Sequence, residues 1–146
     1  MTTVATSSVT TTSISRAAAA ELIAVARSAA ADIGVDLAIA VTDAAGHLRA
    51  FEAMDGTPFL AHEVAVNKAW TAAAYRLPTH VWSSVVQDPA VAQLAHIPRL
   101  VAVGGGYPVI ENGVVIGGLG LSGGNADQDQ QAAAAALTAL GFDRPA

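Results

Sequence analysis

Apolar residues recur at helical spacing in three long parts of the chain. The first predicted helix begins at Ser13 or Ser15, since either hydroxyl can cap a helix, and it ends near Ile33 before Gly34. The second covers residues 59–75, and the third covers residues 126–140 and stops at Gly141. Two shorter helical pieces are expected at residues 79–86 and 90–96, next to prolines.

Short runs between these helices predict strands, some because they are rich in β-branched residues and one, residues 47–53, because it alternates after a turn. Residues 35–42 and 47–53 are joined by a turn at 43–46, which indicates an antiparallel hairpin. Residues 100–103 and 114–121 are predicted to form a second pair around Glu111-Asn112-Gly113. Asn-Gly between apolar runs favours a hairpin, because both residues tolerate the positive φ of a type I′ turn.

The order helix, hairpin, helix, short helices, hairpin, helix is typical of an α+β domain. We expect an antiparallel sheet of four to five strands flanked by helices. Residues 1–12 are expected to be a flexible N-terminal tail, and residues 13–146 a single domain.

Composition excludes several classes of partner. The net charge is −5, and no cluster of lysine and arginine is present, so neither nucleic acid nor a membrane is expected as a partner. The chain has no cysteine, no signal-peptide pattern and no apolar run long enough to span a membrane, which predicts a soluble cytoplasmic protein. Hydrophobic residues, mostly alanine, make up 53%, which favours a homo-oligomer.

Glycines concentrate between positions 104 and 124, and they suggest a close approach to the backbone. Gly104, Gly105 and Gly106 are consecutive, and further glycines interrupt the last predicted strand. The approaching group could be another segment of the chain or a flat ligand. A nucleotide site is not indicated, because neither a dinucleotide fingerprint nor a Gly-Lys-Ser/Thr motif is present.

None of the four histidines lies in a metal-binding pattern such as HExxH. We expect His47 to be exposed after its turn and His96 to lie at a helix end. His62 shares a helix face with small residues, so it could face a cavity, the core or an interface. His80 follows Pro78-Thr79, where a short loop could direct it toward a ligand.

Three other polar residues could carry chemistry. Lys68 lies among small apolar residues in a helix, so it could pair with a buried carboxylate, act as an amine of lowered pKa, or extend to solvent. Asp129 opens the last predicted helix, where the helix dipole favours a carboxylate. Ser122 fits the Gly-x-Ser-x-Gly pattern, but no histidine follows it to complete a hydrolase triad.

Several motifs together resemble the GlcG/HbpS family, also described as the haem-degrading or DUF336 domain, which includes the C-terminal domain of PduO. The resemblance extends over about residues 17–140. The matching residues are Met54-Asp55-Gly56, Asn67-Lys68-Ala69-Trp70-Thr71-Ala72, Leu77-Pro78-Thr79, Gly104-Gly105-Gly106-Tyr107-Pro108-Val109, the glycines of 117–124, and Gln128-Asp129.

The resemblance implies a profilin-like fold and homo-oligomers from dimer to octamer. It also implies binding of haem or a related tetrapyrrole as the small-molecule ligand. Candidate iron ligands are His62 and His80, with the Thr79 hydroxyl and Tyr107 as further candidates.

The sequence is compatible with three functional interpretations. The first is a haem-binding protein whose cavity is lined by the glycines 104–106, with Tyr107 and Ser122 nearby. The second is an enzyme acting on a small catabolic metabolite, with Lys68 and Asp129 as polar anchors and glycine backbone amides as an oxyanion site. The third is an oligomeric scaffold without a ligand.

Overall fold

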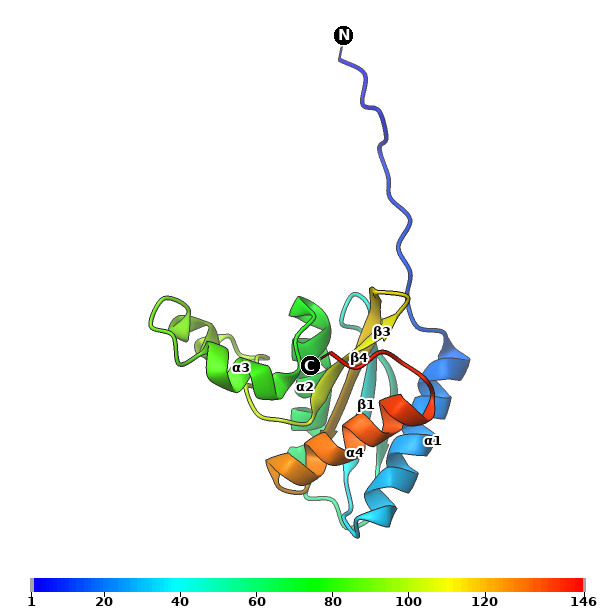
Figure 1. Ribbon diagram of the computed structural model, residues 1–146, viewed down its shortest axis with the longest axis vertical. Helices are drawn as coiled ribbons and strands as arrows, with labels where there is room; N and C mark the ends of the chain where they lie inside the picture. The colour runs from blue at the N-terminus through cyan, green and yellow to red at the C-terminus, as the bar shows by residue number, and fades with distance from the viewer. Residues whose placement is uncertain (1, 146) are drawn as a thin grey trace.

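A four-stranded antiparallel sheet organises the chain in the computed structural model, which describes residues 2–145. The strands are β1 (Ala38–Asp43), β2 (Leu48–Ala53), β3 (Gly106–Glu111) and β4 (Val114–Ser122), in the spatial order β2-β1-β4-β3. Helices α1 (Arg16–Asp32) and α4 (Ala126–Ala139) lie on one face, and α2 (Phe59–Tyr75) lies on the other (Figure 1). The predicted α+β fold, with an antiparallel sheet of four to five strands flanked by helices, is confirmed, and the sheet has four strands.

Alternation along β1 divides the core into two parts. Ile39 and Val41 point toward α1 and α4, within the larger hydrophobic core. Ala38 and Ala40 point the other way and pack on alanines of α2. The two sides therefore differ in kind, with large aliphatic side chains on one face and methyl groups on the other.

Glycines of β4 allow α2 to lie directly on the sheet. A Cβ at Gly118 would lie 2.0 Å from the carbonyl oxygen of Ala69, and a Cβ at Gly120 would lie 2.0 Å from that of Ala65. Both distances are far below van der Waals contact, so no larger residue fits at either position. The expected close approach to these glycines is made by the backbone of α2.

Local signals in the sequence set several of the boundaries. Ser15 caps α1, because its hydroxyl accepts a hydrogen bond from the amide of Ala18 at 3.1 Å. Gly34 follows the helix with φ of +71°. Asn112 and Gly113 have φ of +52° and +76°, which confirms the predicted turn between β3 and β4.

The predicted strand at residues 100–103 is wrong, since β3 begins only at Gly106. The tight turn at Asn112-Gly113 fixes the pairing of β3 with β4, and residues 106–111 are the ones opposite. Residues 100–103 instead run beside α2, where the amide of Val101 donates to the Thr71 hydroxyl at 3.1 Å. Leu100, Val101 and Ala102 are half-buried in this position, whereas Val103 is exposed.

The remaining differences are small. Helix α3 (Thr79–Val85) agrees with expectation, and the piece predicted at residues 90–96 is a 3₁₀ helix, η1 (Ala92–His96). Residues 2–13 are exposed and contain no helix or strand. The first of them extend away from the domain (Figure 1), whereas the hydroxyl of Ser13 accepts a hydrogen bond from the amide of Ala44 at 3.0 Å. Flexibility of this tail and the limits of the single domain stay predictions. Residue 1 of the predicted tail and residue 146 of the predicted domain lie outside the described residues.

Candidate functional site

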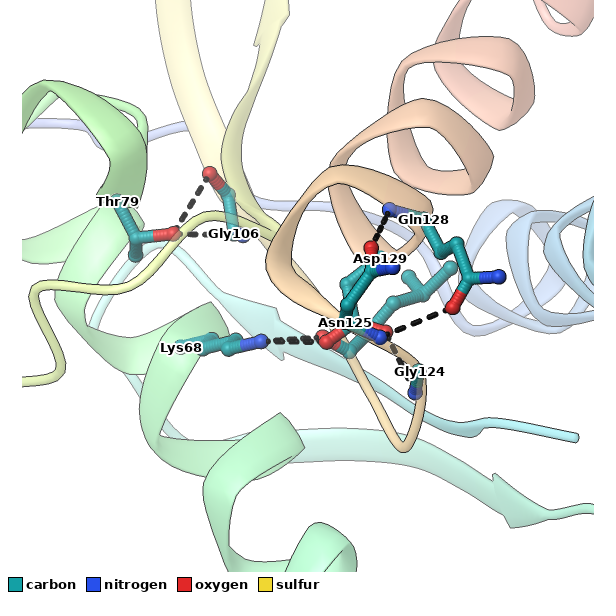
Figure 2. A network of polar contacts seen from close by, with 8 residues as sticks. Lys68, Thr79, Gly106, Gly124, Asn125, Gln128 and Asp129 are labelled. Atoms are coloured by element: carbon teal, nitrogen blue, oxygen red, sulfur yellow. Dashed lines mark hydrogen bonds and ion pairs between the residues drawn. The ribbon is translucent and has the colours of Figure 1, made fainter. Parts of the chain in front are cut away.

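A buried ion pair connects the two helical layers. Nζ of Lys68, on α2, lies 2.9 Å from Oδ2 of Asp129, on α4, and donates a second hydrogen bond to the carbonyl of Leu121 at 3.0 Å (Figure 2). Lys68 is 1% exposed and Asp129 is 2% exposed. Burial lowers the pKa of Lys68, while the hydrogen bond and charge of Asp129 oppose that effect. Of the possibilities that the sequence left open for Lys68, the structure shows pairing with a buried carboxylate.

The start of α4 holds Asp129 in place. Asn125 accepts a hydrogen bond from the amide of Gln128 at 2.8 Å, and the side chain of Gln128 accepts one from the amide of Asn125 at 3.0 Å. This reciprocal capping box satisfies two amides at the helix terminus. The other oxygen of Asp129 accepts from the amide of Gly124 at 2.9 Å (Figure 2). Both carboxylate oxygens therefore have partners.

The glycines 104–106 wrap closely around this pair. Gly105 has φ of +123°, and a Cβ there would lie 2.8 Å from Nζ of Lys68. A Cβ at Gly106 would lie 2.6 Å from the methyl group of Thr79, whose hydroxyl accepts the amide of Gly106 at 2.8 Å. Thr79 is fully buried. Side chains and backbone of the protein thus fill the space beside both glycines.

His80 and Tyr107 border the same region. Their ring centroids are 5.7 Å apart, and Nδ1 of His80 is buried with no hydrogen-bond partner among the described residues. Burial raises the pKa of Tyr107, against the effects of Gln130 and the charge of Arg144. A Cβ at Gly104 would lie 3.5 Å from Cβ of His80. The fold therefore gathers most of the residues predicted from the sequence into one region.

His62 lies elsewhere, toward the opposite edge of the sheet. Its ring meets that of Phe51 on β2 edge to face, with centroids 5.6 Å apart. Phe51 is 40% exposed, and Phe59, which precedes His62 by three residues on α2, is 87% exposed. His62 itself is half-buried. We call Phe51, Phe59 and His62 the aromatic cluster.

The other polar candidates occupy ordinary structural positions. Ser122 is buried at the end of β4, opposite Ala38 in the sheet register. His47 is exposed after its turn and His96 is exposed at the end of η1, as expected. Within residues 2–145, no group of three or more His, Asp or Glu side chains is arranged to hold a metal ion.

A cavity of about 350 Å³ lies between α2, α3, η1 and the segment that follows η1. No single local pattern in the sequence indicates this cavity, because its walls come from segments that are separate in the sequence. A detectable signal was the recurrence of large apolar residues in the short pieces after Pro78 and Pro89. The lining residues are Trp70, Thr71, Ala74, Tyr75, Leu77, Trp82, Val85, Val91, Leu94, Ile97 and Leu100.

Among residues 2–145, no helix is both long and apolar enough to cross a membrane.

These features define a small α+β domain with an antiparallel sheet between two helical layers. The model of the family described as haem degrading protein HbpS-like matches residues 14–138, and the chain belongs to this family. The resemblance to GlcG, HbpS and the PduO domain expected from the sequence is thereby confirmed.

Individual relatives agree with this assignment. An uncharacterized 15.0 kDa protein from the dhaT-dhaS intergenic region of Citrobacter freundii is 37% identical over 127 residues, covering 85% of this chain and 89% of that protein. The crystal structure of Klebsiella pneumoniae ORFY matches with a TM-score of 0.88 and 33% identity, covering 95% of this chain and 98% of that one. The crystal structure of a PduOC:heme complex matches with a TM-score of 0.83 and 30% identity, covering 92% of this chain and 99% of that one.

Proposed function

We propose that this protein binds haem or a related tetrapyrrole, with His62 as the axial ligand. The observation that supports this proposal is the similarity to PduOC, which was crystallised with haem. The described residues contain no methionine-rich or cysteine site, so an imidazole is the natural ligand for iron.

The aromatic cluster fits a flat apolar ligand better than the region around the glycines 104–106. A porphyrin needs an accessible nitrogen beside apolar surface. The ring of His62 contacts that of the partly exposed Phe51, and the exposed Phe59 lies three residues before His62 on α2. Arg49, two residues before Phe51 on β2, is exposed and could pair with a propionate carboxylate. In this proposal the imidazole holds the iron and the phenylalanines shield the macrocycle from water.

His80 is the second candidate ligand. If Nε2 of His80 held the iron, the ring proton would be on Nδ1. Because Nδ1 is buried without a hydrogen-bond partner among the described residues, a buried N–H would then be left unpaired. The glycines beside it are covered by Lys68 and Thr79, which leaves less room for a macrocycle than the aromatic cluster does.

Haemin titration tests the proposal. We expect a saturable Soret shift in the wild-type protein, its loss in His62→Ala, and its retention in His80→Ala. His96→Ala is the matched control, because that histidine is exposed on η1, away from the aromatic cluster. Absence of a shift in the wild type would exclude haem binding, and an unchanged shift in His62→Ala would exclude this ligand.

The enzyme interpretation has weaker support from the geometry. Lys68 and Asp129 already bond to each other, to Leu121 and to Gly124, so neither side chain offers a free polar atom to a substrate. The amide of Gly106, one of the proposed oxyanion donors, already donates to Thr79. We therefore propose that the ion pair stabilises the fold.

A further inference from the structure

We propose that the cavity between α2, α3 and η1 is a second binding site, for a small neutral aromatic molecule of roughly two or three rings. The site is distinct from the aromatic cluster, with which it shares no residue. The proposal goes beyond haem binding and does not depend on it.

The lining selects for an apolar ligand. Among the described residues, the wall contains no histidine, lysine, arginine or carboxylate, so it offers neither an iron ligand of the histidine type nor a partner for a charged group. Thr71 is a polar residue of the lining, but its hydroxyl is already within hydrogen-bond distance of the carbonyls of Asn67 and Arg99, at 2.7 and 3.1 Å. A charged ligand would lose its hydration without compensation there.

Three aromatic side chains from two helices, α2 and α3, form part of the walls. Trp82 on α3 meets Tyr75 on α2 edge to face, with centroids 5.8 Å apart. Trp70 is held in position from outside the cavity, since the guanidinium of Arg99 lies 4.8 Å from its ring centroid. Rings of this kind present flat faces and edges to which another ring packs well.

The volume of the cavity indicates the size of the ligand. An apolar cavity of about 150 Å³ stays dry and takes up benzene. The cavity here, of about 350 Å³, is roughly twice as large and lies at the lower end of ordinary ligand pockets. A single ring would leave voids, whereas a porphyrin would find no nitrogen ligand in the lining.

The position of α3 and η1 explains why the cavity is not closed by the core. Both pieces lie to one side of the sheet, beyond the edge where β3 runs (Figure 1). Pro78 precedes α3, and its fixed φ turns the chain away from α2 after Arg76, which has φ of +57°. The short helices therefore approach α2 as a separate wall and leave space between.

The neutral fluorescent probe N-phenyl-1-naphthylamine tests the site. We expect saturable fluorescence enhancement in the wild-type protein, with one probe bound per chain. Val85→Trp places a large side chain in the cavity and should abolish the enhancement, and Leu94→Trp serves if that variant fails to fold. Val114→Trp is the matched control, because it adds the same ring at an exposed position at the start of β4 that is not part of the cavity lining.

Comparison with haemin separates this site from the proposed haem site. We expect Val85→Trp to retain the Soret shift and His62→Ala to retain probe binding. Lack of saturable enhancement in the wild type, equal loss in Val85→Trp and Val114→Trp, or displacement of the probe by haemin would each overturn the proposal. So would light scattering that shows wild-type assemblies dissociating in Val85→Trp, because the cavity would then be a contact between copies of the chain.

Discussion

Replacing Lys68 by methionine is the sharpest test of the buried ion pair. Methionine retains most of the apolar stem, but it leaves the carboxylate of Asp129 buried with only the amide of Gly124 as a partner. Removing one member of a buried pair typically costs about 3–5 kcal/mol. A domain of this size has a total stability of roughly 5–15 kcal/mol, so the variant should be close to unfolding.

A double-mutant cycle isolates the interaction between the two charges. Asp129→Asn removes the negative charge but keeps an oxygen for the amide of Gly124. Because the second substitution relieves the unpaired charge left by the first, Lys68→Met/Asp129→Asn should be more stable than the sum of the single losses predicts. We expect a coupling of about 1–3 kcal/mol.

Urea unfolding at one fixed protein concentration measures these differences, with fluorescence of Trp70 and Trp82 as the signal. Circular dichroism of each variant shows whether it folds. A loss below about 1 kcal/mol for Lys68→Met, or strictly additive losses in the cycle, would refute the argument that the pair is buried and mutually dependent.

Three further predictions concern other parts of the fold. Gly118→Ala should lower the free energy of unfolding, measured with urea, by about 3 kcal/mol or more, because the new Cβ meets the backbone of α2. Gly34→Ala should lower it by only roughly 1 kcal/mol, because that position has open space and the cost comes from its positive φ alone. Asn125→Ala should cost about 1 kcal/mol through loss of the capping box, and an unchanged midpoint would contradict this. For Asp43, burial raises the pKa, but hydrogen bonds from two amides and the charge of His47 outweigh it and lower the pKa overall. The pKa of Asp43 is thus lower in the folded than in the unfolded protein, so its carboxylate stabilises the fold above about pH 4 and this stabilisation is lost as the pH falls. Asp43→Asn should therefore make the free energy of unfolding depend less on pH in the acid range. The same pH dependence in the variant and the wild type would contradict this.

Much of the fold could be predicted because local signals agreed with one another. The cap at Ser15, the stop at Gly34 and the turn at Asn112-Gly113 each depend on neighbouring residues alone. Residues 100–103 misled the prediction because a β-branched apolar run suits both a strand and an irregular segment that runs beside a helix. Only the register set by the following turn decides between them.

The site could be predicted only in part, because its contacts join distant positions. The surroundings of Lys68 left burial beside a carboxylate as one of several possibilities, and its partner Asp129 is 61 residues away in the sequence. The cavity combines α2, α3 and η1, and no spacing within one element reveals such an arrangement. His62 and Phe51 likewise meet only because β2 and α2 pack on each other.

The flat contact between α2 and β4 has a mechanical consequence. Gly118 and Gly120 offer the helix no side chains to interlock with, so this surface resists separation far better than it resists sliding. Lys68 reaches past the sheet to Asp129 and fixes the position of the helix along the strand. Without that tether, we expect α2 to sample neighbouring positions in the folded state, visible as doubled amide resonances for Ala65 and Ala69. The ion pair therefore sets the alignment of two layers that are otherwise smooth.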